Sequence, residues 1–291
     1  MIRYTTAGIG LFALLQAVPT DRVRTQSMGV SDNLYLLSGG GGNSLMMAAD
    51  TGVMIVDAKS EGQGRTILDV ASGISDQPIT TAIYTHAHLD HTAGSKDIPT
   101  LRQIIAHENT KANMARLPLF GGASARFLPD RTLADRMTIG EGIDRVELYY
   151  FGRGHTNGDL VVVFPGKRAA YLGDLFPGKM IPAIDSANGG SGLAWPHTLV
   201  KAIQELKGSV RIIPGHGVAP PGSPLGRWIN MVDLEEYANF THDLVATAQE
   251  AFKTGKTAEA AAASLTLRER YPAYNFDGAR EAVQAIYAEL R

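Results

Sequence analysis

The chain contains no cysteine, so disulfide bonds and thiolate ligands are excluded, and cysteine usage does not indicate a redox compartment. Neither sign of charge dominates, because 27 lysine and arginine residues are balanced by 29 aspartate and glutamate residues, for a formal net charge of −2. The sequence therefore offers no basic stripe for nucleic acid, which argues against a nuclease. With 44% hydrophobic residues over 291 positions, the chain can bury a substantial core.

A membrane-spanning run is missing as well. Near the amino terminus, residues 7–18 are mostly apolar, follow the single positive charge of Arg3 and include small residues near Ala17. This run is shorter than the ~20 residues that a comfortable span requires, so we expect no stable membrane span. It resembles a secretory signal peptide, which predicts an exported protein, periplasmic or secreted. The alternative for residues 1–27 is a disordered or loosely packed extension, in which case the protein would be cytoplasmic.

Histidine makes up only 8 of the 291 residues, yet five of the eight fall in three short motifs. The motifs are Thr85-His86-Ala87-His88-Leu89-Asp90-His91, Gly154-His155-Thr156 and Pro214-Gly215-His216-Gly217. Neutral imidazole and carboxylate are the ligands that zinc and similar divalent metals prefer. The clustering therefore predicts a metalloenzyme.

The first motif follows a predicted strand. Residues 78–85 are rich in β-branched side chains, which is typical of a buried strand. The histidines are therefore expected at the carboxyl end of this strand. His86 and His88, two residues apart, can point to one side and bind one metal. Asp90 and His91 are adjacent and can turn towards a second.

Together with Gly173-Asp174, the three motifs resemble the ligand series of the metallo-β-lactamase-fold hydrolases, in the family's order, over about residues 28–220. The resemblance implies two metal positions that share one carboxylate. The ligands would be His86, His88 and His155 at the first position, Asp90, His91 and His216 at the second, and the bridging Asp174 at both. Two Zn2+ ions are expected, with iron or manganese as alternatives.

Asp174 distinguishes branches of this family. The antibiotic-hydrolysing members have a cysteine, or no bridging ligand, at this step, so the aspartate is closer to the glyoxalase II, lactonase and phosphodiesterase branches. Two divalent ions ~3.5 to 4 Å apart can lower the pKa of a shared water towards ~7. The resemblance thus implies a hydrolase that uses a metal-bound hydroxide against an ester, thioester, lactone, β-lactam or phosphodiester, with β-lactams disfavoured.

Asp90 would have a catalytic role besides binding metal, since it could orient the hydroxide or pass a proton to the leaving group. Two other functions stay open. One is an oxidoreductase resembling the persulfide dioxygenases, with one iron held by two histidines and an aspartate, and the other is a metal-binding protein without catalysis. The expected partner is a small-molecule substrate, and the sequence gives no indication of an oligomeric state.

The pattern of apolar segments predicts an α/β fold. Strands are expected at residues 33–37, 44–49, 52–57, 78–85, 103–106, 145–150, 159–164, 169–172 and 210–213, and helices at 65–72 and 198–206. Strands this apolar suit sheets that are covered on both faces. The resemblance implies a four-layer αββα metallo-β-lactamase-like sandwich over residues 28–220. Helical spacing in residues 221–291 predicts C-terminal helices packed on the same domain.

The remaining candidates are weaker. We expect His107 to be structural and His242 to lie on a helix surface, whereas His197 could line the mouth of the active site. Two loops, residues 117–127 and 176–195, are predicted to contact substrate. Their candidate side chains are Phe120, Phe127, Met180 and Trp195 for an apolar mouth and Arg126 or Lys179 for a substrate carboxylate. Tyr171 could donate to an oxyanion, although packing within its strand is favoured.

Overall fold

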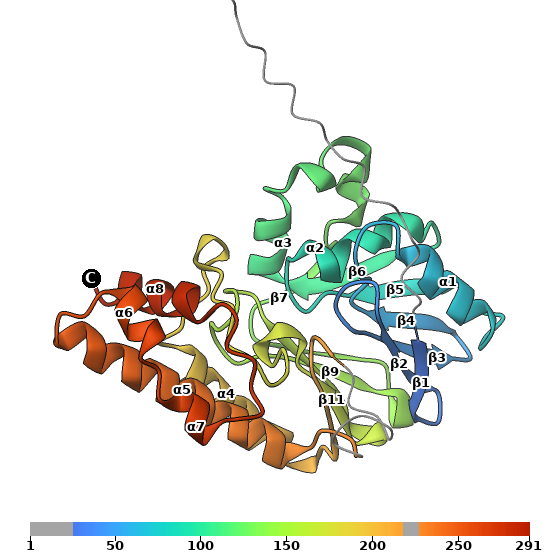
Figure 1. Cartoon of the computed structure of the whole chain (residues 1–291). Coiled ribbons are helices and arrows are strands. Elements are labelled where there is room, and N and C mark those ends of the chain that lie inside the picture. Colours follow the sequence, from blue (N-terminus) through green and yellow to red (C-terminus); the bar gives the residue numbers. More distant parts are fainter. Residues whose placement is uncertain (1–25, 218–226) are drawn as a thin grey trace, which may run out of the picture.

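Two β-sheets form the centre of the molecule in the computed structural model, which describes residues 26–217 and 227–291 (Figure 1). The seven-stranded sheet has the order β1-β2-β3-β4-β5-β6-β7, and the five-stranded sheet has the order β12-β11-β10-β9-β8. The first sheet contains β1 (Gln26–Ser31), β2 (Leu34–Ser38), β3 (Ser44–Ala49), β4 (Gly52–Val56), β5 (Ile79–Ile83), β6 (Gln103–His107) and β7 (Arg131–Leu133). The second contains β8 (Arg136–Ile139), β9 (Val146–Tyr150), β10 (Leu160–Phe164), β11 (Ala169–Tyr171) and β12 (Arg211–Ile213).

Each sheet changes from antiparallel to parallel pairing along its width. Strands β1 to β4 pair antiparallel, and β4 to β7 pair parallel. In the second sheet only β11 and β12 pair parallel. Parallel neighbours need a crossover connection, which α1 (Gly64–Ser72) supplies between β4 and β5 and α4 (Trp195–Glu205) supplies between β11 and β12. The carboxyl ends of the parallel strands carry most of the histidine motifs.

Both faces of the central strands are buried, which explains why these strands are apolar at nearly every position. In β10, Leu160, Val162 and Phe164 pack between the two sheets, whereas Val161 and Val163 pack with the helices outside the second sheet. On the outer face of the first sheet, Ile67 of α1 is fully buried against the strands. Helices therefore cover both outer faces, and the predicted four-layer α/β sandwich is confirmed.

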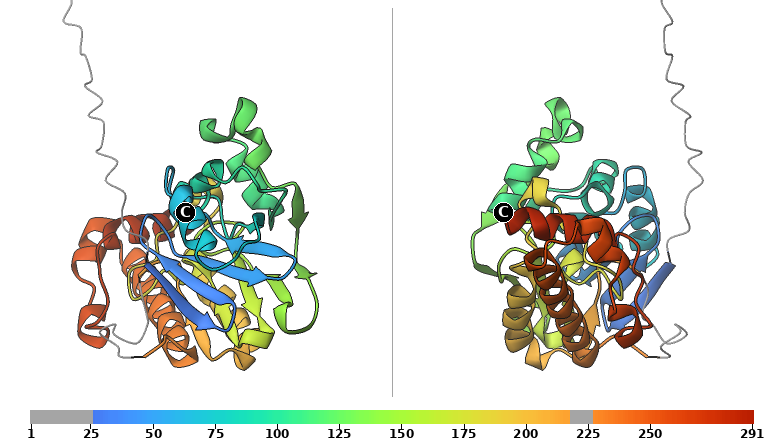
Figure 2. Two further views of the ribbon diagram at one scale, coloured as in Figure 1. Left: turned by 90° about the vertical axis from the view of Figure 1, so that its right-hand side faces the viewer. Right: turned by 60° about the vertical axis from the view of Figure 1, so that its left-hand side comes forward.

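The C-terminal helices cover the second sheet. They are α5 (Met231–Lys253), α6 (Ala258–Ala263), α7 (Leu267–Arg270) and α8 (Ala279–Glu289). Figures 1 and 2 show these helices, in orange and red, on the far side of the sheets from α1. Their aromatic and aliphatic side chains share one hydrophobic cluster with β10, β11, β12 and α4. Among the described residues, no helix is long and apolar enough to cross a bilayer.

Several elements differ from the sequence-based expectation. The strands β1 and β7 and the short helices α2 (Leu89–Thr92) and α3 (Glu108–Met114) were not predicted. Helix α4 starts at Trp195 rather than at Thr198, because Pro196 is accommodated in the first turn, where a helix needs no backbone N–H from it. The predicted signal peptide lies outside the described residues, except that Gln26 and Ser27 belong to β1.

Candidate metal centre

Seven histidine and aspartate side chains from four loops meet where the two sheets adjoin. They form two groups, and within each group the potential ligand atoms lie within 4.8 Å of one another. The first group is His86, His88, His155 and Asp174, and the second is Asp90, His91 and His216. Each group draws on the loop after β5 in the first sheet and on loops of the second sheet.

Histidines of the first group are oriented by hydrogen bonds on their outer sides. Nε2 of His88 lies 2.7 Å from Oδ2 of Asp185, and Nδ1 of His155 lies 2.6 Å from the carbonyl oxygen of Ala183. Their inner nitrogens, Nδ1 of His88 and Nε2 of His155, are 2.8 Å apart. If the outer nitrogens carry the protons, the inner ones face each other as two lone pairs, which a shared cation satisfies.

Two buried atoms at the centre have no hydrogen-bond partner, namely Nε2 of His86 and Oδ1 of Asp174. An unsatisfied buried polar atom costs ~1–3 kcal/mol. Burial lowers the pKa of His86 well below its ordinary value and that of His155 to about 4, so both rings are neutral at pH 7. Burial alone would raise the pKa of Asp174, but His91 and His216 outweigh it and keep this group a carboxylate. The neutral rings of His86 and His155 beside this buried carboxylate fit a divalent cation.

Asp174 lies between the two groups. Its Oδ2 is 3.7 Å from Nε2 of His155 in the first group and 3.2 Å from Nε2 of His216 in the second. Its Oδ1 is 3.3 Å from Nε2 of His91. In the second group, Oδ2 of Asp90 is 3.4 Å from Nε2 of His216. One carboxylate thus faces ligand atoms of both groups, which is the position that a bridging ligand requires.

The members of the centre differ in exposure to solvent. The side chains of His88 and His216 are 31% exposed and that of Asp90 is 38% exposed, whereas that of His91 is completely buried. A substrate can therefore approach along His88, Asp90 and His216.

Asp57 was not recognised in the sequence as part of the site. Its side chain is completely buried, and its Oδ2 lies 2.7 Å from Nδ1 of His91. The same carboxylate accepts hydrogen bonds from the backbone N–H and the hydroxyl of Thr85 and from the hydroxyl of Tyr171. Asp57 therefore holds the His91 ring with Nδ1 protonated and Nε2 turned inward. The only sequence signal was an aspartate at the end of an apolar strand.

Other histidines lie outside the centre. His107 is buried and caps α3, with Nδ1 accepting from the backbone N–H of Asn109 and Nε2 3.1 Å from the carbonyl oxygen of Ala134. His242 is exposed on α5, and both residues are placed as expected. His197 is exposed on α4 and is not among the residues lining the cleft beside the first group.

The predicted apolar mouth is wrong for three of its four side chains. Phe120 and Phe127 pack in the core outside the first sheet, and Trp195 packs in the core outside the second, where its Nε1 donates to the carbonyl oxygen of Leu175. Two 3-10 helices, Pro118–Phe120 and Gly122–Phe127, fold the aromatic rings inward.

The three polar candidates, two from the loops and one from a strand, are engaged elsewhere. Arg126 stacks on the ring of Phe127, and Lys179 pairs with Glu236. Tyr171 packs in its strand, as favoured, and donates its hydroxyl within the protein.

A small cleft of about 210 Å³ adjoins His88 and His155. Its walls are the mostly apolar residues 181–185 and the segment around the start of α8, including Gly278 and Ala282. The charged residues among its lining in the described chain are all acidic: Asp185, Asp277 and Glu281. The cleft therefore suits a small substrate without a large negative charge.

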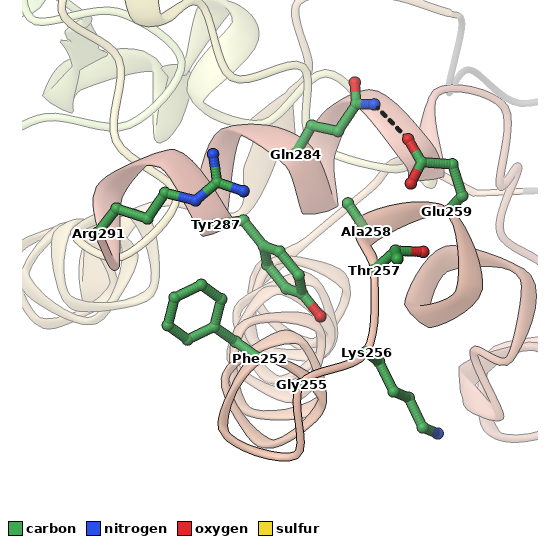
Figure 3. A pocket seen from close by; sticks show the side chains of 9 residues that line it. All are labelled: Phe252, Gly255, Lys256, Thr257, Ala258, Glu259, Gln284, Tyr287 and Arg291. Atoms are coloured by element: carbon green, nitrogen blue, oxygen red, sulfur yellow. Dashed lines mark hydrogen bonds between the residues drawn. The ribbon is translucent and has the colours of Figure 1, made fainter.

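A larger pocket, of about 560 Å³, lies between the ends of α5 and α8 (Figure 3). Phe252 and Tyr287 form its apolar wall, and Gln284 bonds Glu259 at one side of it. None of the seven centre residues lines this pocket. Its size alone does not indicate a catalytic role.

A family model described as "Metallo-beta-lactamase superfamily" matches residues 37–216, a region that contains all seven residues of the centre. Among curated proteins, the 2,4-dinitroanisole O-demethylase subunit alpha of Nocardioides sp. (strain JS1661) is 34% identical over 162 residues, which cover 54% of this chain and 46% of that protein. The metallo-beta-lactamase type 2 of Bacillus sp. (strain 170) is 23% identical over 184 residues, covering 60% of this chain and 66% of that one. The chain thus spans between about half and two thirds of these relatives.

Solved structures show the same fold at low sequence identity. A stereoselective inverting sec-alkylsulfatase from Pseudomonas sp. superposes with a TM-score of 0.72 and 16% identity, covering 91% of this chain and 50% of that one. A metallo-beta-lactamase from Pontibacter korlensis superposes with a TM-score of 0.62 and 18% identity, covering 75% of this chain and 99% of that one.

Proposed function

Because the chain belongs to the metallo-beta-lactamase superfamily, we propose that it is a hydrolase with a two-metal centre. The observation that carries this proposal is the pair of unpartnered buried atoms, Nε2 of His86 and Oδ1 of Asp174, at the meeting point of the two groups. Most buried polar atoms in proteins have a hydrogen-bond partner, and these two lie among other imidazole and carboxylate atoms that could bind the same cation.

The proposed metal is zinc, because three imidazoles at one position favour it. The proposed ligands are His86, His88 and His155 at the first position, Asp90, His91 and His216 at the second, and Asp174 at both. Two bound metal ions would supply an activated water at neutral pH and a Lewis acid for the bond to be cleaved.

The protein's own side chains would position and protonate the reactants. Asp90 is the most exposed carboxylate of the centre, and its Oδ2 lies on the open side, beside His216. It is therefore placed to accept a proton from the attacking water and to pass it to the leaving group. Asp57 and Asp185 bond the outer nitrogens of His91 and His88, and so turn the inner nitrogens of these rings towards the proposed metal positions.

The cleft favours uncharged substrates. Its lining combines Ile181, Pro182 and Ala282 with acidic side chains, and such a surface repels phosphodiesters and carboxylate-bearing β-lactams. We therefore propose a small carboxylic ester, thioester or lactone as substrate.

A second candidate is the O-dealkylation of an uncharged aromatic ether. It is favoured by the 34% identity to a subunit of a 2,4-dinitroanisole O-demethylase. Such a substrate would suit the same cleft, because it is small and carries no carboxylate or phosphate.

The test combines metal analysis with a substrate panel. The purified protein should contain about two zinc ions per chain and should hydrolyse an aryl ester, a thioester or a lactone faster than nitrocefin or bis-p-nitrophenyl phosphate, with 2,4-dinitroanisole assayed in parallel. A chelator should abolish turnover and added zinc should restore it. His86→Ala should lose metal and activity, whereas His242→Ala, at an exposed histidine, should keep both.

Three outcomes would contradict the proposal. Turnover that survives complete removal of metal would exclude the two-metal mechanism. A single bound iron with oxygen uptake on a persulfide would favour the oxidoreductase instead. Two bound zinc ions without turnover of any ester, thioester, lactone or ether would favour a non-catalytic metal-binding protein.

A further inference from the structure

Lys59 is a completely buried lysine whose amino group bonds to backbone rather than to a carboxylate. Its Nζ donates to the carbonyl oxygens of Leu37, at 2.9 Å, and Gly42, at 3.0 Å. Burial lowers the pKa of this amine to about 7, against the opposing influence of Asp57. The backbone of Lys59 is also left-handed, with φ 64°. Burying an amine and straining a non-glycine backbone are both unfavourable, so this position calls for a role beyond packing.

The lysine anchors a glycine-rich loop, residues 39–43, that connects β2 to β3. The next residue, Ser60, donates its backbone N–H to the carbonyl oxygen of Gly40 at 3.1 Å. On its other side, the carbonyl oxygen of Lys59 accepts from the backbone N–H of Gly94 at 3.0 Å. The segment of Lys59 and Ser60 therefore ties the loop to the turn after the first histidine motif.

Gly42 brings this loop against two residues of the second group. Its backbone N–H donates to the carbonyl oxygen of Asp90 at 3.0 Å. A Cβ atom at Gly42 would overlap the ring of His91, so the backbone lies directly on that imidazole. The carbonyl group that bonds Lys59 thus belongs to the residue that covers His91.

Asn43 extends the contact to the third residue of the second group. Its side-chain amide donates to the carbonyl oxygens of Pro214, at 2.9 Å, and Gly217, at 2.7 Å. Its backbone N–H donates to the carbonyl oxygen of Gly215 at 2.7 Å. Asn43 thus bonds the residues immediately before and after His216 in the sequence. Within the described residues, no recorded hydrogen bond links the loop to His86, His88 or His155.

We propose that Lys59 is a positioning residue for the second metal position: it fixes the loop of residues 39–43, and the loop in turn fixes Asp90, His91 and the turn that carries His216. The inference rests on the proposed two-metal function. It adds an asymmetry to that function, because the second position depends on Lys59 and the first does not.

The test is a zinc titration of the metal-free protein in competition with a chromophoric chelator. Lys59→Met removes the N–H donors and keeps an unbranched side chain that is shorter by one atom. The parent protein should bind two equivalents, and the variant should bind the second about 10- to 100-fold more weakly, as is typical when a residue that supports a ligand is lost. Its first equivalent should keep the parental affinity. With cobalt as probe, only the visible bands of the second equivalent should change.

Lys167→Met is the matched control. Lys167, in the turn between β10 and β11, is also buried. Its Nζ, however, pairs with the carboxylate of Asp144 at 3.0 Å. Its replacement removes a buried amino group without touching the loop, so neither binding step should change.

If Lys59→Met does not fold, Asn43→Ala carries the test, because it removes the other side-chain link of the same loop. A selective loss of the second equivalent supports the inference. Parental affinity for both equivalents, or an equal loss of both, overturns it. A parent protein that binds fewer than two equivalents would instead refute the proposed function itself, and that failure appears before any variant is measured.

Discussion

Replacing Asp57 by asparagine should affect the two metal positions differently. Oδ1 of the buried carboxylate accepts from the backbone N–H of Thr85 at 2.8 Å, and Oδ2 accepts from Nδ1 of His91 at 2.7 Å. An asparagine amide offers only one oxygen, so either orientation places an N–H group against a fixed donor. With the amide nitrogen towards His91, the conflict is relieved only if the ring moves its proton to Nε2. That nitrogen is the one proposed to bind metal.

The structure sets the size of both effects. Unless the His91 ring changes its tautomer, one donor remains mismatched in the buried site, which costs ~1–3 kcal/mol, so the metal-free Asp57→Asn protein should lose up to about 3 kcal/mol of unfolding free energy. Loss of a carboxylate that orients a ligand lowers metal affinity ~10- to 100-fold, which corresponds to ~1.4–2.8 kcal/mol. This second loss should fall on the position that contains His91.

Urea unfolding of the metal-free protein and a two-step zinc titration measure these quantities. Asp185→Asn is the matched control, because Oδ2 of Asp185 lies 2.7 Å from Nε2 of His88 in the first group. Asp57→Asn should weaken the second binding step and Asp185→Asn the first. If both variants weaken the same step, or if Asp57→Asn leaves both steps unchanged, the orienting role assigned to Asp57 is refuted.

Three further predictions concern the cleft, the general base and pH. Ala282→Leu should lower kcat/KM about tenfold for a bulky aryl ester and much less for a methyl ester at unchanged metal content; equal losses would show that the substrate does not enter this cleft. Asp90→Asn should reduce turnover more than bound metal, and matching losses in the two measurements would make Asp90 only a ligand. Because burial lowers the pKa of Lys59 to about 7, between pH 7 and about 10 the unfolded state binds the extra proton. The unfolding free energy of the metal-free protein should therefore rise with pH there, by at most ~1.4 kcal/mol per unit. Lys59→Met should lose this rise in urea unfolding at pH 7 and 9, and parallel profiles for variant and parent would contradict the assignment.

The strands could be located from the sequence where burial on both faces leaves a continuous apolar signal. β10 is such a strand, since its alternate side chains enter two different cores. β7 gives no such signal, because it has three residues and both Arg131 and Thr132 are exposed. β1 likewise begins with exposed polar residues. Pairing with a neighbouring strand, rather than local sequence, makes these segments β.

Convergence of the seven centre residues could be expected because their motifs follow strands of a recognisable family pattern. The residues that support them could not, since Asp57 and Lys59 read locally as the end of a strand and a charged turn. Only the packing of β4 against β5 and the loop of residues 39–43 reveals their contacts. The prediction for Trp195 was wrong because its segment looked irregular in the sequence. The residue is in fact the buried first residue of a helix.

The division of each ligand group between the two sheets has a consequence for biosynthesis. His86, His88, Asp90 and His91 leave the ribosome long before their partners, so a nascent first sheet holds an incomplete set of donors for either ion. The first position is complete once Asp174 has emerged, whereas the second must wait for His216. The donor sets for the two proposed ions would thus be completed in a fixed order, and the second could not be complete until the last strand of the second sheet had been made.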